Sequence, residues 1–416
     1  MSEFRFLHAA DIHLDSPLRG LEADASAPVE VIRGATRRAL GKLVDLALAE
    51  GVAFVLIAGD IYDGDWPDFG TGLFFAAQMR RLTDAAIPVF AVRGNHDAAN
   101  RMTRSLRMPH VTVFEHGRAH TLPVLEALGV AVHGQSFADQ AVPHDLSRAY
   151  PPPLEGLFNI GVLHTSAAGY AAHAAYAPCE VPRLKAHGYD YWALGHVHTR
   201  EVLSEDPWIV FPGNLQGRHV GETGPKGASL VTVANGRVRS VEHCVLDALR
   251  WANVEVDVTG AADEAEALIR VQAALDAALR DAAPRPLAIR LALVGVTNAH
   301  AALAGIGLRD KVLNEAHGLG GEHLLWLEAV RLRTHPASDA ALPARTDNLG
   351  RLLDEIEALA ASPPTGLLGD WPATLLGKLG EALPQGHPLL DCAGGNVAAV
   401  MEQARRKLQA ALAGFG

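Results

Sequence analysis

The sequence predicts a layered α/β protein with more than one domain. The chain has 416 residues, which is more than one ordinary domain holds. Hydrophobic residues make up 49% and charged residues 20%, the usual balance of a globular protein. Short apolar runs alternate with segments of helical periodicity through the first 250 residues, and the same alternation starts again near Trp251. We therefore expect a large α/β domain followed by a smaller one.

The first domain is predicted from its strands and helices in order. Residues 4–10 form an apolar strand, and apolar residues recur at helical spacing over 29–49. The run 53–58 is continuously apolar, as in a strand that is covered on both faces. The further expected elements are a helix at 69–82 and strands at 87–92, 130–134, 159–163, 191–194, 209–211 and 230–233.

The order strand, helix, strand, helix, strand predicts the smaller domain. These elements are expected at 251–258, 261–279, 287–294, 298–315 and 323–333. A stretch rich in proline and small residues follows, and then come three helical segments separated by proline and glycine. The predicted organisation is a first domain at 1–250, a small α/β domain at 251–333, a linker at 334–346 and a helical C-terminal region at 347–416.

Charge and cysteine content exclude several classes of protein. The formal net charge is −11, and neither half of the chain is basic, which argues against a tight, non-specific polyanion-binding module but leaves a local basic groove open. The three cysteines are widely spaced without a CxxC pair, so a disulfide framework or structural zinc is not expected. No signal-peptide pattern and no membrane-length apolar run is found. We expect a cytoplasmic protein with no membrane association.

Acidic, amide and imidazole side chains follow the ends of five predicted strands. In chain order they are Asp11 and His13, then Asp60, then Asn95, His96 and Asp97, then His164, then His196 and His198. Sites in open α/β sheets form at the carboxyl ends of strands, so we expect these side chains to meet. Such a mixture of donors suits manganese, iron or zinc better than calcium or magnesium.

There are too many candidate ligands for one ion. One carboxylate can bridge two ions about 3.5–4 Å apart. Asp60 is the expected bridge, because a tight Gly59–Asp60 turn leaves its carboxylate pointing out of the sheet.

Each motif by itself also has a purely structural interpretation. The Asp11-Ile12-His13 segment could be a polar loop, and Asp60 could be a helix N-cap. Gly94-Asn95 is typical of turns, GHVH could end a surface strand, and a single His164 is more often a hydrogen-bonded polar residue than a ligand. All five together, each after an apolar strand, favour a metal site.

The motifs D-x-H, GD, GNHD, H and GHxH, in this order, resemble those of the calcineurin-like metallophosphoesterases. The flanking segments AADIHLDSP, AGDIYDG, PVFAVRGNHD, NIGVLHT and DYWALGHVH resemble the bacterial DNA-repair exonucleases of the SbcD type. The resemblance is strong over about 4–245, extends at fold level to about 333 and is weak beyond. It implies a sandwich of sheets with flanking helices, with 251–333 as a capping domain and a helical C-terminal tail.

The resemblance also implies a role for each candidate residue. It implies two divalent metal ions, with manganese favoured and iron or zinc as alternatives. Asp11, His13 and His198 would bind the first ion, Asn95, His164 and His196 the second, and Asp60 both. His96 would be the proton donor or would stabilise the transition state, and Asp97 would orient it. An imidazole next to the ligand Asn95 can reach the scissile phosphate, and it titrates near neutral pH.

Arg218 is a candidate substrate-binding residue. It follows the last metal-binding strand in the segment 212–219, which borders the site in the family that the chain resembles. Its guanidinium could hold a phosphate through two hydrogen bonds, whereas a solvated loop arginine is an equally good interpretation.

The resemblance implies two-metal hydrolysis of DNA phosphodiesters in DNA repair, by exonuclease and alternatively endonuclease action. The implied partners are DNA, a second copy of the chain in a homodimer and a coiled-coil ATPase of the SbcC type. Two other functions stay open: a phosphatase or phosphodiesterase acting on small substrates, and a catalytically idle scaffold subunit of such an ATPase.

Overall fold

The computed structural model describes residues 3–16, 29–63, 69–99, 108–122, 125, 127–167, 177–319 and 325–337. The chain divides into two compact units. The first unit comprises Met1–Val254, Ala273–Leu291 and Leu313–Val330, and the second comprises Glu255–Gln272, Ala292–Val312 and Arg331–Gly416. All of the predicted site residues belong to the first unit. The predicted C-terminal helices and most of the predicted linker lie outside the described residues.

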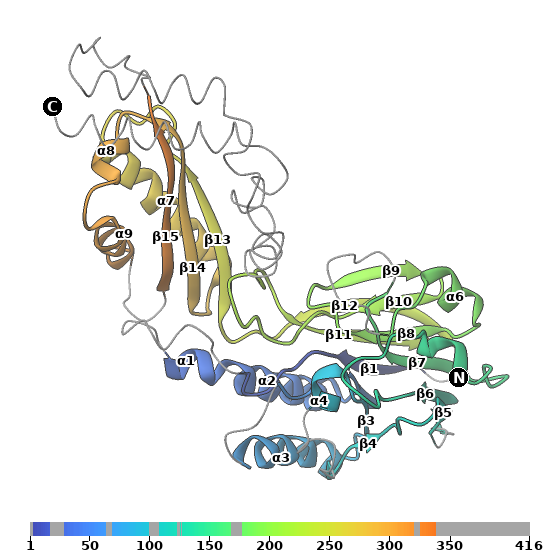
Figure 1. Cartoon of the computed structure of the whole chain (residues 1–416). Coiled ribbons are helices and arrows are strands. Elements are labelled where there is room, and N and C mark those ends of the chain that lie inside the picture. Colours follow the sequence, from blue (N-terminus) through green and yellow to red (C-terminus); the bar gives the residue numbers. More distant parts are fainter. Residues whose placement is uncertain are drawn as a thin grey trace, which may run out of the picture. The chain divides into compact units, whose positions relative to one another are not determined.

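Two six-stranded sheets form the centre of the first unit (Figure 1). One sheet has the order β12-β11-β1-β2-β3-β4. Its strands are β1 (Phe4–Ala9), β2 (Phe54–Ala58), β3 (Val89–Val92), β4 (Thr112–Val113), β11 (Gly227–Ala234) and β12 (Arg237–Val245). β1, β2 and β3 run parallel, whereas β11 pairs antiparallel with β1. The three strands followed by predicted site residues in this sheet therefore end at one edge.

The other sheet has the order β5-β6-β7-β8-β10-β9. Its strands are β5 (His120–Thr121), β6 (Val130–Gly134), β7 (Phe158–His164), β8 (Tyr191–Gly195), β9 (Glu201–Glu205) and β10 (Trp208–Phe211). β6, β7 and β8 are parallel, so the ends of β7 and β8 lie side by side. The sequence did not predict β4, β5, β9 and β12; β9 and β12 lie at sheet edges, where partial exposure breaks the apolar pattern.

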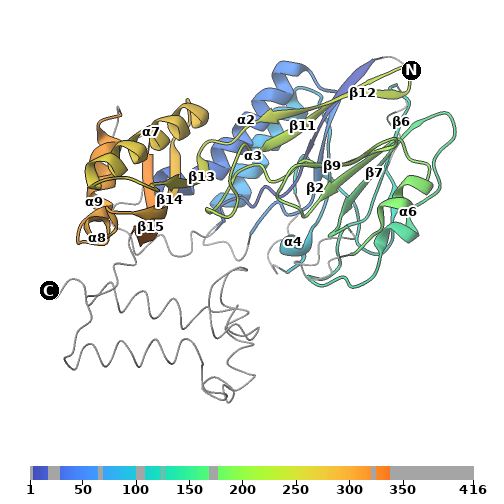
Figure 2. The same ribbon diagram turned by 90° about the horizontal axis from the view of Figure 1, so that it is seen from above.

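Alternation along the strands separates three apolar cores. In β1, Phe6 faces the core between the sheets, where it stacks on Phe54 with ring centroids 4.9 Å apart, and Leu7 faces the opposite core. That opposite core packs against α2 (Ala35–Glu50) and α3 (Gly70–Asp84). Trp192 of β8 belongs to a third core on the outer side of the second sheet, with Leu184 of α6 (Val181–Ala186). Helices and sheets thus form the predicted layers (Figure 2).

The helix α2 forms because its apolar residues fall on one face. Ala39, Leu40, Leu43, Val44 and Ala47 are buried, and the spacing between them is helical. The helix ends at Gly51, whose φ of 56° is the left-handed conformation that glycine adopts easily at a C-cap. The single helix expected at 29–49 is in fact divided into α1 (Val29–Arg33) and α2.

The remaining strands form a sheet of their own, in the order β13-β14-β15. Its elements are β13 (Arg250–Asp257), α7 (Glu264–Ala282), β14 (Leu287–Thr297), α8 (His300–Leu303), α9 (Leu308–His317) and β15 (Leu325–Pro336). The helix expected at 298–315 is two helices, interrupted where Gly307 adopts a φ of 89°. Within the described ranges, no helix has both the length and the apolar character needed to cross a bilayer.

Candidate metal centre

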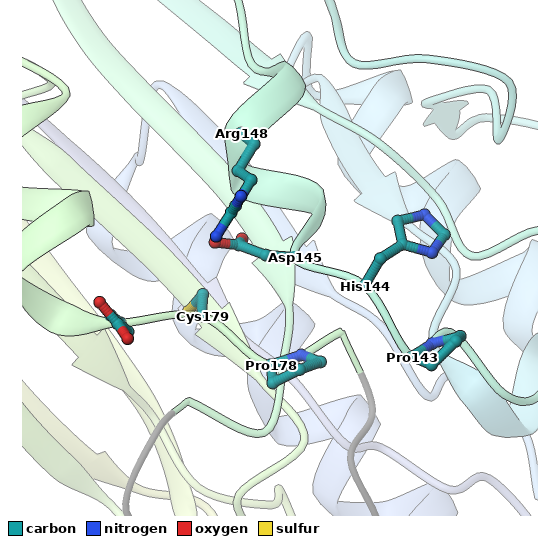
Figure 3. Close-up of a pocket in the computed structure, with 7 residues that line it drawn as sticks. Pro143, His144, Asp145, Arg148, Pro178 and Cys179 are labelled. Carbon is teal, nitrogen blue, oxygen red and sulfur yellow. The ribbon is translucent and has the colours of Figure 1, made fainter.

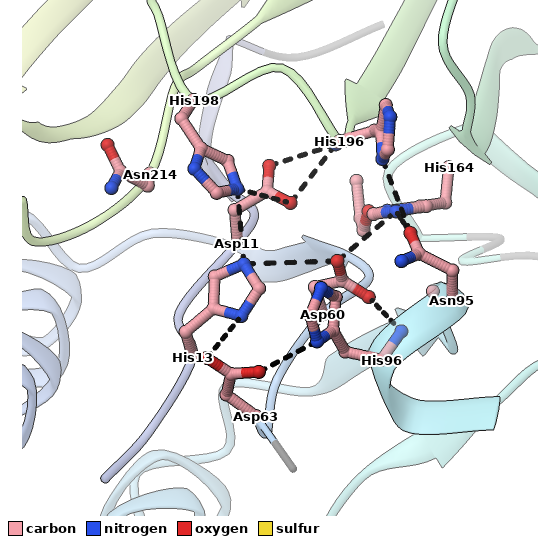
Figure 4. Close-up of polar contacts among 12 residues, drawn as sticks. Asp11, His13, Asp60, Asp63, Asn95, His96, His164, His196, His198 and Asn214 are labelled. Atoms are coloured by element: carbon pink, nitrogen blue, oxygen red, sulfur yellow. Dashed lines mark hydrogen bonds and ion pairs between the residues drawn. The ribbon is translucent and has the colours of Figure 1, made fainter. Parts of the chain in front are cut away.

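The seven predicted ligands gather where the parallel strands of both sheets end (Figure 4). Asp11 and His13 follow β1, Asp60 follows β2, and Asn95 begins α4 (Asn95–Ala99) after β3. His164 is the last residue of β7, and His196 and His198 follow β8. Asp11, His13, Asp60 and His196 have φ values of 50°, 44°, 51° and 106°. Such unfavourable backbone conformations cluster at functional sites.

Glycines allow the two sheets to approach each other at this edge. A Cβ on Gly195 would lie 1.9 Å from the carbonyl oxygen of Ala58, and one on Gly94, which follows β3, would lie 2.8 Å from Cε1 of His164 in the other sheet. Real Cβ atoms do not tolerate such distances, so these positions require glycine.

The first group of donors surrounds His13. Its Nε2 lies 3.1 Å from His198 Nε2 and 3.8 Å from Asp60 Oδ2. His198 Nε2 in turn lies 3.9 Å from Asp11 Oδ1. Two atoms bound to one ion at about 2.1 Å are about 3.0–3.5 Å apart, so these separations suit a shared cation after small adjustments.

The second group of donors surrounds His164. Its Nε2 lies 3.0 Å from Asn95 Oδ1 and 3.5 Å from Asp60 Oδ2. His196 Nδ1 lies 3.3 Å from the same Asn95 oxygen. Asp60 Oδ2 therefore stands between the two groups, as the bridging role requires.

The hydrogen bonds of His164 test whether these residues fit a metal. Its Nδ1 lies 2.9 Å from the carbonyl oxygen of Ala58, which can only accept, so Nδ1 carries the hydrogen. Burial lowers the pKa of His164 to about 3, so the ring is neutral and Nε2 has no hydrogen. Nε2 therefore presents a lone pair to the oxygens of Asn95 and Asp60. Three acceptors that face one another are stabilised by a cation, so these residues fit a divalent metal ion.

The charges of the cluster point to the same conclusion. Burial raises the pKa of the Asp11 carboxyl well above its usual range, and the nearby charge of Asp60 raises it further. Burial also raises the pKa of Asp60 and lowers that of His13. Divalent cations would stabilise the charged carboxylates and the neutral imidazoles together.

His96 lies at the rim of the cluster, with 39% of its side chain exposed. Its backbone N–H donates to Asp60 Oδ1 over 2.9 Å, and its ring lies 4.9 Å from that of His13. The ring Nδ1 lies 2.7 Å from Asp63 Oδ1, and this hydrogen bond raises the pKa of His96 above its ordinary value. Since Nδ1 is held by Asp63, Nε2 is the nitrogen left to face a substrate.

Asp97 does not orient His96 as expected. Its carboxylate accepts hydrogen bonds from the backbone N–H groups of Ile61, Tyr62 and Gly94, over 3.0–3.2 Å. Asp97 is directed at these amides because it lies in the first turn of α4 and is fully buried beneath the loop after β2. It connects the two loops that carry Asp60 and Asn95. The partner of the His96 ring is Asp63.

Arg218 lies close to the cluster but is engaged by two carboxylates. Its Nη1 donates to Asp63 Oδ2 over 2.8 Å, and its Nη2 donates to Glu222 Oε1 over 3.0 Å. Only 15% of its side chain is exposed. Binding of a phosphate by Arg218 remains a prediction.

Sequence reasoning missed two carboxylates. Asp63 lies three residues after Asp60, a closeness that could have marked it as part of the site. Glu222 lies 2.7 Å from His198 Nδ1 through its Oε1 atom, and no motif marks it. Burial alone would raise the pKa of Glu222, but the hydrogen bond with His198 and the charge of Arg218 outweigh it and lower the pKa.

A separate surface pocket of about 580 Å³ lies elsewhere in the first unit (Figure 3). Its lining residues are Pro143, His144, Asp145, Arg148, Pro178, Cys179 and Glu180. Asp145 is held there by Arg183, whose Nε lies 3.3 Å from its Oδ2. The pocket shares no residue with the metal centre.

The chain is similar to known phosphoesterases along most of its length. Residues 4–200 match the family described as calcineurin-like phosphoesterase, and residues 251–335 match the middle domain of metallophosphoesterase YhaO. The uncharacterized metallophosphoesterase YhaO of Bacillus subtilis (strain 168) is 30% identical over 361 residues, which are 86% of this chain and 88% of that protein.

Proteins described as DNA double-strand break repair protein Mre11 are more distant relatives. The one from Sulfurisphaera tokodaii is 22% identical over 281 residues, which are 64% of this chain and 68% of that protein. The one from Aeropyrum pernix is 26% identical over 276 residues, or 61% and 64%. With the order and geometry of the site motifs, the extended match to the Bacillus protein shows that the chain belongs to the calcineurin-like phosphoesterase family.

Proposed function

We propose that this chain is a two-metal phosphodiesterase that cleaves DNA in DNA repair, as an exonuclease or an endonuclease. The observation that carries the proposal is the position of His96 beside the ligand cluster. One of its ring nitrogens lies within 4.8 Å of ligand atoms of His13 and Asp60. A proton donor next to two clusters of metal ligands suits cleavage of a phosphoester bond. The relatives named for DNA double-strand break repair support DNA as the substrate.

The chemistry is divided between the ions and the chain. Two divalent cations supply, when bound, Lewis acidity toward the phosphoryl oxygens and a hydroxide nucleophile at neutral pH. Asp60 would contribute to holding both ions, because its Oδ2 lies between the two donor groups. His96 gives its proton to the oxygen that leaves phosphorus, while Asp63 stabilises the charged imidazole beforehand. No covalent intermediate with the protein is required.

The proposed partners are DNA, a second copy of the chain and an SbcC-type coiled-coil ATPase. The net charge of −11 supports a subunit that gains part of its DNA affinity from a partner. Light scattering on the purified chain tests the homodimer, since a single-chain mass would contradict it. Tight DNA binding by the isolated chain that does not change with salt would contradict the proposal that part of the DNA affinity comes from a partner.

Digestion of end-labelled single- and double-stranded DNA tests the activity. The full chain is assayed with and without Mn²⁺, beside bis-p-nitrophenyl phosphate as a diester and p-nitrophenyl phosphate as a monoester. We expect Mn²⁺-dependent cleavage of DNA and of the diester, and loss of both in the His96→Asn variant.

Two outcomes would overturn the proposal. Preferred hydrolysis of the monoester, with DNA left intact, would make the protein a phosphatase. Absence of turnover on all substrates, together with capture of an ATPase, would make it a scaffold subunit.

A further inference from the structure

Glu222 is buried beside the metal centre, where it contacts the nitrogen of His198 that faces away from the other ligands. Each of its carboxylate oxygens accepts from more than one donor. His198 Nδ1 and Arg218 Nη2 lie 2.7 and 3.0 Å from Oε1. Asn214 Nδ2 and the backbone N–H of Arg218 lie 2.9 and 2.8 Å from Oε2. With 7% of its side chain exposed, Glu222 is held in a single position.

The contact with Glu222 determines which nitrogen of His198 faces the ligand cluster. A carboxylate only accepts, so His198 Nδ1 carries the hydrogen and Nε2 presents a lone pair toward His13 and Asp11. Metal-ligating histidines commonly depend on such an outer carboxylate, which fixes both the tautomer and the orientation of the ring.

Arg218 connects Glu222 to Asp63 and thereby to His96, the proposed proton donor. Its Nη2 contacts Glu222, and its Nη1 donates to Asp63 Oδ2 over 2.8 Å. The other oxygen of Asp63 lies 2.7 Å from His96 Nδ1. An uninterrupted series of contacts therefore runs from His198 through Glu222, Arg218 and Asp63 to His96, and we call it the brace.

The loop that carries the brace is itself anchored. Gln216 Oε1 accepts from the backbone N–H of Ala248 over 2.7 Å, and its Nε2 donates to the carbonyl of Leu249 over 2.7 Å. Trp251 Nε1 donates to the carbonyl of Gly217 over 2.9 Å. Arg218 would have to break two ion pairs to turn toward a phosphate.

We propose that Glu222 and Arg218 are positioning residues: Glu222 presents His198 to the first metal ion, and Arg218 holds Glu222 and Asp63 so that His198 and His96 face the same space. This assignment replaces a phosphate-binding role for Arg218. It rests on the proposed two-metal function but is tested by metal binding, independently of activity.

The Glu222→Gln variant tests the first half. Both oxygens of Glu222 accept hydrogen bonds. In the glutamine variant an NH₂ group replaces one of these oxygens, so in either orientation of the amide this NH₂ group faces hydrogen-bond donors. Mn²⁺ binding is measured from the electron paramagnetic resonance of the free ion. We expect two sites in the unchanged protein, and in the variant one site weakened by about 10–100-fold with the other retained.

The retained site reports correct folding, because a misfolded chain would lose both. The matched control is Glu205→Gln, at an exposed carboxylate of β9, where both sites should be unchanged. Equal Mn²⁺ affinities at both sites in Glu222→Gln and in the unchanged protein would overturn the proposal.

Arg218→Gln and Arg218→Lys test the second half, with the exposed Arg80→Gln as control. For Arg218→Gln with bis-p-nitrophenyl phosphate as substrate, we expect kcat to fall about 10-fold or more and KM to change little. Arg218→Lys should restore only part of the lost kcat, because a lysine cannot contact both carboxylates. A raised KM with unchanged kcat and Mn²⁺ affinity would establish a substrate clamp and overturn the brace.

The two proposals fail in different ways. Loss of one Mn²⁺ site in Glu222→Gln, in a protein that cleaves no DNA, would support the brace and refute the nuclease. If the protein cleaves DNA and its Glu222→Gln variant binds Mn²⁺ normally, the nuclease proposal would be supported and the brace refuted.

Discussion

Asp63 Oδ1 lies 2.7 Å from Nδ1 of His96, although 33 positions of the chain separate the two residues. The contact joins the loop after β2 to the first turn of α4. It gives His96 a fixed ring orientation and a stabilised positive charge. Much of the expected chemistry of the site follows from this pair.

Asp63→Asn is expected to shift the pH dependence of turnover. The hydrogen bond with Asp63 raises the pKa of His96. In the proposed reaction the charged form of His96 is the proton donor. Without the carboxylate the pKa falls, so His96 loses its proton at a lower pH and the alkaline decline of kcat moves to lower pH. The pH profile of diester hydrolysis measures this, and an alkaline decline at the same or higher pH would contradict it.

His96→Asn is expected to retain metal and lose turnover. His96 supplies the proton to the leaving oxygen in the proposed reaction, and general acid catalysis contributes about 10²–10⁴-fold. Turnover of the diester is compared with Mn²⁺ stoichiometry in the same preparation. Near-normal turnover would refute the role of His96 as proton donor.

Asp60→Asn is expected to abolish binding of at least one ion. Asp60 Oδ2 lies between the two donor groups, and an amide cannot bridge two cations as a carboxylate does. Mn²⁺ stoichiometry by equilibrium dialysis checks this, with the exposed Asp84→Asn as control. Two fully occupied sites in the Asp60 variant would rule out the bridge.

Gly195→Ala is expected to destabilise the junction of the two sheets. The added Cβ would lie 1.9 Å from the carbonyl oxygen of Ala58, and forced over-packing costs about 1–3 kcal/mol. The control is Gly41→Ala in α2, where a Cβ meets nothing within 4 Å and should stabilise the helix by about 0.5–1 kcal/mol. Urea unfolding measures both changes, and equal effects of the two substitutions would contradict the expected contrast.

His8 is expected to make the fold sensitive to acid. It contacts the Tyr191 hydroxyl and the Leu194 carbonyl in the core, and burial lowers its pKa from 6.5 to about 3. Between these values the unfolded chain binds a proton that the folded chain does not, so stability is lost as the pH falls, by up to about 1.4 kcal/mol per pH unit.

Urea unfolding at several pH values between 7 and 4 measures the contribution of His8. His8→Gln should reduce the slope of unfolding free energy against pH, whereas His116→Gln at an exposed position should not. The same slope in His8→Gln and the unchanged protein would show that His8 does not produce the sensitivity.

Local sequence patterns predicted most of the fold. The strands that position ligands, β1, β2, β3, β7 and β8, are buried and consist mostly of apolar residues, so the sequence pattern predicts them. The sequence pattern did not predict the edge strands β9 and β12, which are partly exposed. It also did not predict the interruptions of the expected helices near Gly34 and Gly307. At these positions the local secondary structure depends more on neighbours in space than on apolar periodicity.

By itself, the sequence determined the layered architecture and the set of residues that gather at the strand ends, because a residue's position relative to its own strand is local information. Only the tertiary structure decided that Asp63 holds His96, that Asp97 joins two loops and that Glu222 stands behind His198. Arg218 and Asp63 are 155 residues apart, and their contact depends on how two loops pack and on which donors and acceptors burial forces together. No pattern along the chain records that pairing.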